Sequence, residues 1–248
     1  MLVMWYNTLM YILKLDGWGY ILEQHSHSGH RSRMKNRFLK TGFDGFEPHE
    51  ALELFLFYGI PKRDTNKLAH DLIEQFGSIA GVMNAPYELL LQVKGVGEHV
   101  AILLKQMPQM FRLYSEDMAK PSQIMDTPDK WRKFFKAKFV GRVNEVLFVA
   151  GIDDFARFVA CELLNQGSRK AVNISCELII RFAMRWNVDR IVLAHNHPNG
   201  VATPSIQDKI KTQDLVLALK SLNMTLVDHF IFGKSGDSTS MREYNILR

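Results

Sequence analysis

The fold of the C-terminal part of the chain is decided by the stretch Arg190-Ile191-Val192-Leu193-Ala194-His195-Asn196-His197-Pro198-Asn199-Gly200. Its first five residues are mostly apolar and β-branched, which predicts a buried strand. Pro198 and Gly200 then turn the chain. Because residues i and i+2 of an extended chain point to the same side, His195 and His197 are expected to converge at the end of this strand.

A second signature follows the turn, at Ser205-Ile206-Gln207-Asp208. Apolar residues continue with helical spacing to Leu222, so an amphipathic helix is expected from Ile206. A serine with an acid three residues later is typical of a capped helix start and by itself indicates no more than that. Beside the two histidines, however, Asp208 can turn back to the same point. Two imidazoles and one carboxylate leave a fourth tetrahedral position open, as in catalytic zinc sites.

The rest of the C-terminal sequence alternates between strand and helix patterns. Short apolar strands are expected at Glu145–Ile152 and Leu226–Phe232, and a helix is expected within Ala171–Trp186. Strands that alternate with helices predict an α/β layer domain. The basic and aromatic run Lys130–Lys138 is interpreted as a helix that buries its aromatic residues and leaves its basic residues in solvent.

The preceding half of the chain has only helical patterns, separated by glycines and prolines. Helices are expected at Glu47–Tyr58, Lys67–Gln75, Pro86–Val93 and Glu98–Tyr114. The stretch Ser115–Pro128 contains two prolines and is the expected linker. We therefore expect an extension of unknown role over residues 1–24, a helical domain over residues 25–120 and a metal-binding domain over residues 121–248.

A glycine pair, Gly95 and Gly97, lies between two of the expected helices. The surrounding sequence Val93-Lys94-Gly95-Val96-Gly97 resembles the hairpin of a helix-hairpin-helix. Such glycines permit a tight turn, and the helix that follows offers free N–H groups to a phosphate. Gly95 and Gly97 are thus candidates for contact with a DNA backbone, independent of base sequence. The alternative is a hairpin used for packing or protein docking, since Glu98 would repel a phosphate.

Composition excludes several classes of protein. The chain has 248 residues, of which 47% are hydrophobic, enough for one large or two small domains with a core. Two cysteines exclude a disulfide scaffold and a four-cysteine zinc site, and they indicate a cytoplasmic protein. The net charge of +5 is compatible with nucleic acid without requiring it. Lys14 and Asp16 interrupt the apolar first residues, so no membrane span, signal peptide or membrane partner is expected.

Taken together, His-x-His-Pro-x-Gly and Ser-x-x-Asp resemble the signature of the JAMM metalloprotease-like domain, also called JAB or MPN. The form found here is similar to the RadC family, over about residues 125–245. The resemblance implies a cytidine-deaminase-like α/β domain with a mixed central sheet. It also implies an all-α helix-hairpin-helix domain before it. Asp228 and His229 are expected to support the site or to pack near it.

The resemblance also implies a role for particular residues. His195, His197 and Asp208 would bind Zn²⁺. Glu145, otherwise an ordinary strand carboxylate, would handle the proton of the metal-bound water, and Ser205 would help to stabilise the oxyanion. The implied activity is that of a metallopeptidase-type zinc hydrolase, which cleaves a peptide or isopeptide bond of a peptide or protein substrate by metal-activated water.

A function from another class stays open. The chain would then be an accessory protein of DNA repair or recombination that binds DNA through the hairpin, with a structural or inactive metal site. One departure from the family bears on substrate recognition. Many relatives have Pro-Arg-Glu where this chain has Cys176-Glu177-Leu178, so a positive group near a helix start is replaced by a negative one.

Overall fold

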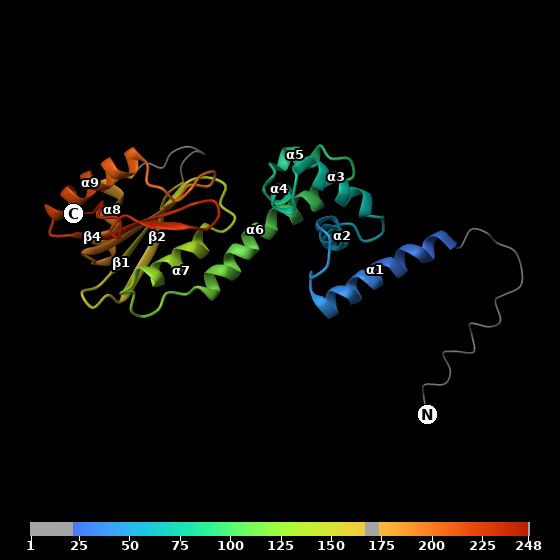
Figure 1. Cartoon of the computed structure of the whole chain (residues 1–248), viewed down its shortest axis with the longest axis horizontal. Coiled ribbons are helices and arrows are strands. Elements are labelled where there is room, and N and C mark those ends of the chain that lie inside the picture. Colours follow the sequence, from blue (N-terminus) through green and yellow to red (C-terminus); the bar gives the residue numbers. More distant parts are fainter. Residues whose placement is uncertain (1–21, 167–173, 248) are drawn as a thin grey trace, which may run out of the picture. The chain divides into compact units, whose positions relative to one another are not determined.

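The computed structural model of the chain describes residues 22–166 and 174–247. Most of the extension expected at residues 1–24 lies outside these ranges. The contacts within the chain divide it after Leu104 into two compact units, whose elements are labelled in Figure 1.

The N-terminal unit is helical, as the sequence predicts. Its helices are α1 (Leu22–Thr41), α2 (Pro48–Gly59), α3 (Asn66–Phe76), α4 (Ile79–Asn84), α5 (Tyr87–Leu91) and the first part of α6 (Glu98–Met118). The residues that give α2 and α3 their helical spacing, among them Leu52, Leu56 and Leu72, form the core of this unit. Val93 and Val96 join the same core from the glycine hairpin. Gly95 has a φ of +100°, a conformation that favours glycine.

Helix α6 extends further than the expected linker allows. It runs without interruption to Met118, past Pro108. Its first residues contribute Val100 and Leu104 to the helical core, whereas Pro108 at its midpoint already belongs to the C-terminal unit and lies against Gly141 of that unit. The contacts thus divide the chain inside α6, while the composition changes later, near the expected boundary between residues 120 and 121.

The C-terminal unit contains a mixed five-stranded sheet in the order β2-β1-β3-β4-β5. Its strands are β1 (Val146–Ile152), β2 (Phe158–Gln166), β3 (Arg190–Asn196), β4 (Thr225–Phe232) and β5 (Ser238–Ser240). Strand β1 is antiparallel to both neighbours, and β3 and β4 are parallel. The expected α/β class and mixed sheet are confirmed, and the strand Arg190–Ala194 lies at the centre of this sheet.

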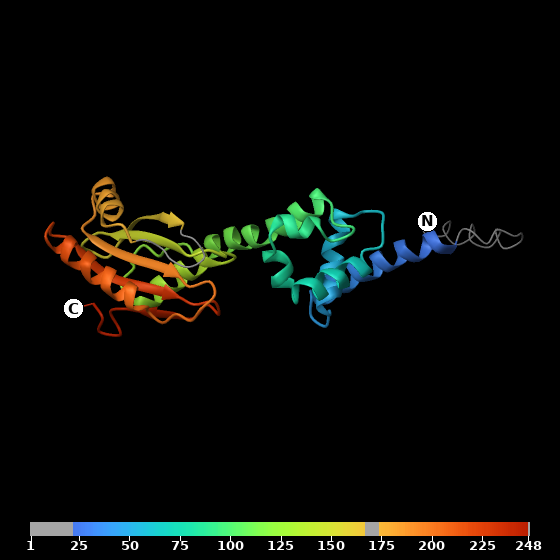
Figure 2. The same ribbon diagram turned by 90° about the horizontal axis from the view of Figure 1, so that it is seen from above.

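Helices cover both faces of the sheet. Helix α7 (Pro128–Phe139) packs Trp131, Phe134 and Phe135 against one face, which confirms the interpretation of the basic and aromatic run. The other face is covered by α8 (Cys176–Trp186) and α9 (Ile206–Lys220). Figure 2 shows α9 lying along the sheet, and among the strands it packs chiefly on β4.

The connection between β3 and β4 determines where a site can form. Because β3 and β4 are parallel, the chain leaves the carboxyl end of β3, returns through α9 and enters β4 at the opposite end of the sheet. The start of α9 therefore lies near the end of β3. In α/β sheets ligands bind at this carboxyl end of the strands.

Among the described helices, none is long and apolar enough to cross a membrane.

Candidate metal centre

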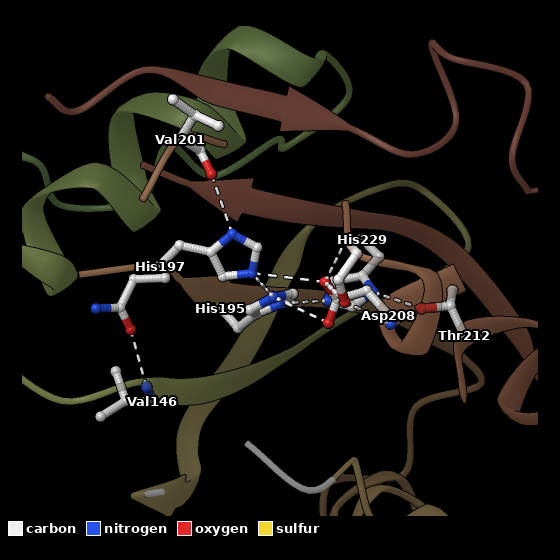
Figure 3. Close-up of polar contacts among 9 residues, drawn as sticks. Val146, His195, His197, Val201, Asp208, Thr212 and His229 are labelled. Atoms are coloured by element: carbon white, nitrogen blue, oxygen red, sulfur yellow. Dashed lines mark hydrogen bonds and ion pairs between the residues drawn. The ribbon is translucent and has the colours of Figure 1, made fainter. Parts of the chain in front are cut away.

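Two histidines meet at the carboxyl end of β3. His195 is the penultimate residue of the strand and is 3% exposed, and His197 follows the strand directly. The backbone N–H of His197 donates to the carbonyl of Phe232 at 2.7 Å, so the turn stays attached to β4. The two Nε2 atoms are 3.0 Å apart, and Figure 3 shows the rings turned toward each other. The convergence expected from the period of a strand is confirmed.

Asp208 completes the group from the first turn of α9. Its Oδ1 atom lies 3.3 Å from Nε2 of His195, and its Oδ2 atom lies 3.5 Å from Nε2 of His197. The three potential ligand atoms all lie within 4.8 Å of one another. Two imidazole nitrogens and a carboxylate oxygen are the donor set of an open metal site with one position left for another ligand. The residues present therefore fit a metal ion.

Ser205 and Asp208 also form a complete capping box at the start of α9. The hydroxyl of Ser205 accepts a hydrogen bond from the backbone N–H of Asp208 at 3.1 Å. The backbone N–H and the hydroxyl of Ser205 donate to Oδ2 of Asp208 at 2.8 and 2.6 Å. The capped helix start and the convergence with the histidines thus occur together. In this geometry the Ser205 hydroxyl proton is already donated to Asp208.

The two histidines determine the charge state of Asp208. Burial alone would raise the pKa of the Asp208 carboxyl, but hydrogen bonds with His195 and His197 outweigh it and hold this pKa far below its usual range. The hydrogen bond with Asp208 raises the pKa of His197 in turn, although burial opposes it. Asp208 is therefore ionised at neutral pH, the state in which a carboxylate binds a metal.

Each histidine has a partner behind it. Nδ1 of His197 lies 3.0 Å from the carbonyl oxygen of Val201, and because a carbonyl only accepts, this nitrogen carries the proton. Nδ1 of His195 lies 2.8 Å from Nε2 of His229, in agreement with the expectation that His229 lies near the site. Nδ1 of His229 lies 2.8 Å from Oγ1 of Thr212 (Figure 3). Sequence reasoning missed Val201 and Thr212, although Thr212 lies one helical turn beyond Asp208.

Glu145 lies next to the site, directly before β1, and is half-buried. Its negative charge contributes to the raised pKa of His197. The two residues that flank it are held by one side chain: Oδ1 of Asn196 accepts from the N–H of Val146 at 2.8 Å, and Nδ2 of Asn196 donates to the carbonyl of Asn144 at 3.1 Å. Asn196 is 4% exposed, and its role was not anticipated.

Fold and site together define the class of the C-terminal unit. It is an α/β domain whose mixed sheet carries a His-His-Asp group, able to hold a metal ion, at the junction of β3 and α9. Residues 125–246 match the family model described as RadC-like JAB domain. The resemblance inferred from the two signatures is confirmed: this part of the chain is a RadC-like JAB domain.

Proposed function

We propose that the C-terminal domain is a zinc-dependent hydrolase of the metallopeptidase type, which cleaves a peptide or isopeptide bond. The observation that carries this proposal is the clustering of the ligand atoms of His195, His197 and Asp208 within 4.8 Å. When bound in such a site, zinc lowers the pKa of its water to about 7 and polarises a carbonyl group.

The chain's own residues divide the remaining work. Nε2 of His195, Nε2 of His197 and the Asp208 carboxylate hold the ion. Glu145 takes a proton from the attacking water and delivers it to the leaving amine, while the hydroxyl of water adds to the carbonyl carbon. Two observations support this role: the effect of Glu145 on the pKa of His197, and the hold of Asn196 on its neighbours.

Ser205 is proposed to donate a hydrogen bond to the oxyanion that forms on the carbonyl oxygen. Its hydroxyl lies 2.6 Å from Asp208, within the same group. To serve the oxyanion, the hydroxyl must turn its proton away from Asp208. The backbone N–H of Ser205 still donates to the carboxylate in that case, so the cap is weakened and not lost.

The test separates metal binding from catalysis. Zinc is measured by elemental analysis, and turnover is measured on any peptide that the wild type cleaves from a broad peptide library. His197→Ala should lose both zinc and turnover. Glu145→Gln should keep the zinc and the fold but lose about 10²–10⁴ in rate, the usual contribution of a general acid–base group. Unchanged zinc in both His195→Ala and His197→Ala, or a wild-type rate in Glu145→Gln, would contradict the proposal.

A second candidate function, contact with a nucleic acid backbone, is favoured by a groove in the N-terminal unit. This groove, of about 400 Å³, is lined by Gly59, Ile60, Pro61, Lys62, Arg63, Gly95, Gly97, His99 and Val100. No acidic residue lines it. Neither Lys62 nor Arg63 forms an ion pair within the described part of the chain. The glycine hairpin thus faces two cations from the loop between α2 and α3, which is a suitable setting for a phosphate.

That loop is held in shape by Arg31 of α1. The Arg31 guanidinium donates to the carbonyls of Ile60 and Pro61 at 2.7 and 2.8 Å, and also to the carbonyl of Arg63. It lies 4.4 Å from the centroid of the Phe57 ring. Because Arg31 is engaged in this way, Lys62 and Arg63 are presented by an ordered backbone.

This second candidate is tested on the full chain with labelled duplex DNA at several salt concentrations. Each phosphate contact contributes about 0.9 to the slope of log affinity against log salt. Lys62→Ala/Arg63→Ala should reduce that slope by about 2. The control Lys40→Ala/Lys67→Ala removes two exposed charges outside the groove and should change it little. Equal slopes in the two double variants would contradict DNA binding in the groove.

A further inference from the structure

We propose that His229 and Thr212 position His195 for metal binding through a buried chain of hydrogen bonds. The inference rests on the proposed metal site and concerns residues outside its ligand set. The chain joins three elements: His195 at the end of β3, His229 in β4 and Thr212 in α9. His229 and Thr212 are fully buried, and His195 is 3% exposed.

The distances leave little freedom in this chain. Both of its links, from His195 to His229 and from His229 to Thr212, measure 2.8 Å. A buried imidazole is costly unless its polar nitrogens have partners. Here each nitrogen of His229 has one, and the partners lie on opposite sides of the ring (Figure 3). The His229 ring is therefore fixed by its two hydrogen bonds.

The direction of the hydrogen bonds decides which nitrogen of His195 is free. If Nδ1 of His195 donates to His229, and His229 donates to Thr212, then Nε2 of His195 keeps a lone pair for the metal. If every bond runs the other way, Nε2 of His195 carries the proton and cannot be a ligand. Metal binding at Nε2 therefore requires His229 to accept from His195, and a Thr212 oxygen that accepts from His229 stabilises that arrangement.

The neighbouring acid, Asp228, is not a member of this series of hydrogen bonds. Its carboxylate accepts from the hydroxyl of Ser240 at 2.5 Å and from the backbone N–H groups of His229 and Arg242. Metal-bound histidines commonly donate their second N–H to a carboxylate, a backbone carbonyl or a water. In this protein the partner of the second nitrogen of His195 is the imidazole of His229, which is in turn hydrogen-bonded to the hydroxyl of Thr212.

Helix α9 thereby affects the position of two of the three metal ligands, Asp208 and His195. Asp208 is in its first turn, and Thr212 lies four residues later on the same face. One residue of α9 contributes a ligand directly, and another orients a second ligand through His229. A small change in Thr212 is thus expected to act on the metal site although Thr212 does not touch the metal.

The experiment uses the full chain and measures affinity for Zn²⁺ alone by competition with a chelator, and the visible spectrum with Co²⁺ alone. Thr212→Val keeps the size of the side chain but removes the acceptor, and affinity should fall about 10–100-fold, as for other partners of metal ligands. Thr212→Ser restores the hydroxyl and should restore both affinity and the Co²⁺ spectrum.

Ser240→Ala is the matched control, because it removes a buried hydrogen bond to Asp228 in the same domain without touching the chain of bonds. It should lower the melting temperature and leave affinity unchanged. If Thr212→Val does not fold, His229→Asn tests the same chain, since the shorter side chain still reaches Thr212 but not His195, and affinity should again fall.

Wild-type affinity in a folded Thr212→Val or His229→Asn variant overturns the inference, and so does an equal loss in Ser240→Ala. These outcomes are distinct from a failure of the metal site itself. That failure would appear as unchanged zinc in His195→Ala and His197→Ala, whereas a failure of the inference alone leaves those two variants without metal.

Discussion

Replacing Asn196 by alanine should both lower the stability of the C-terminal domain and displace Glu145. The side chain of Asn196 accepts from the N–H of Val146 and donates to the carbonyl of Asn144, which flank Glu145. Asn196 and Val146 are both buried, so water does not readily replace the lost acceptor. Glu145 would then lose the support of its backbone on both sides, whatever its chemical role.

The magnitude follows from the two hydrogen bonds. A buried N–H left without an acceptor costs about 1–3 kcal/mol, and a net hydrogen bond lost at the half-buried Asn144 carbonyl costs about 0.5–1.5 kcal/mol. The sum is about 1.5–4.5 kcal/mol. For a domain of this size a loss of about 1 kcal/mol lowers the melting temperature by roughly 3–4 °C, so a decrease of about 5–18 °C is expected.

The assay is calorimetry or urea denaturation of the full chain, followed by zinc content and peptide cleavage. Asn196→Ala should lower the transition of the C-terminal domain, keep the zinc and lose turnover. Asn199→Ala is the control, because this residue is exposed on the same turn and should change stability by less than about 0.5 kcal/mol. If the two variants are equally stable, Asn196 does not support Glu145 in the way argued.

Three further predictions can be checked by simple measurements. Ser205→Ala removes the N-cap of α9 and should cost about 0.5–2 kcal/mol in urea denaturation; no loss would mean that Asp208 alone caps the helix. Burial raises the pKa of Cys161 to about 12, so only about a thousandth of this thiol is ionised at pH 9. Mass spectrometry should therefore find Cys161 alkylated by iodoacetamide only after unfolding, and rapid labelling of the folded chain would contradict this. A backbone hydrogen bond at Glu47 holds the pKa of Glu50 below its usual value of 4.5. Its contribution to stability is thus present above that pH and lost as pH falls through the lower folded value, so wild type and Glu50→Gln should differ at pH 7 and converge at low pH in thermal melts.

The metal group was predictable because each of its residues obeys a local rule. The period of a strand aligns His195 with His197, and a capped helix start places Asp208 in a first turn. The helices of the N-terminal unit were predictable for a similar reason, since their apolar residues repeat at helical spacing. In contrast, Met34 is the one buried residue in the part of α1 whose burial is described (residues 29–41), and a single buried residue leaves no visible period.

The contacts that support the site could not be read from the sequence, because they join residues far apart. Asn196 reads as a spacer between two histidines, yet it binds residues 50 and 52 positions earlier in the chain. Strand β2 was obscured by two irregularities in its pairing with β1, which break the alternation of apolar side chains. The period that identifies a half-buried strand is lost wherever an extra residue enters one strand.

Capping and metal binding by Asp208 are compatible because its two carboxylate oxygens face different partners. The N–H and hydroxyl of Ser205 donate to Oδ2, while Oδ1 lies nearest to Nε2 of His195. A carboxylate oxygen accepts more than one contact, so Oδ2 also stays within 3.5 Å of His197. The two histidines keep Asp208 ionised, and its place at the start of a helix, where negative charge is stabilised, acts in the same direction. An amide at this position would keep an acceptor for the cap but lose the charge that binds a cation. The helix start therefore accepts several residue types, whereas the metal centre requires an acid.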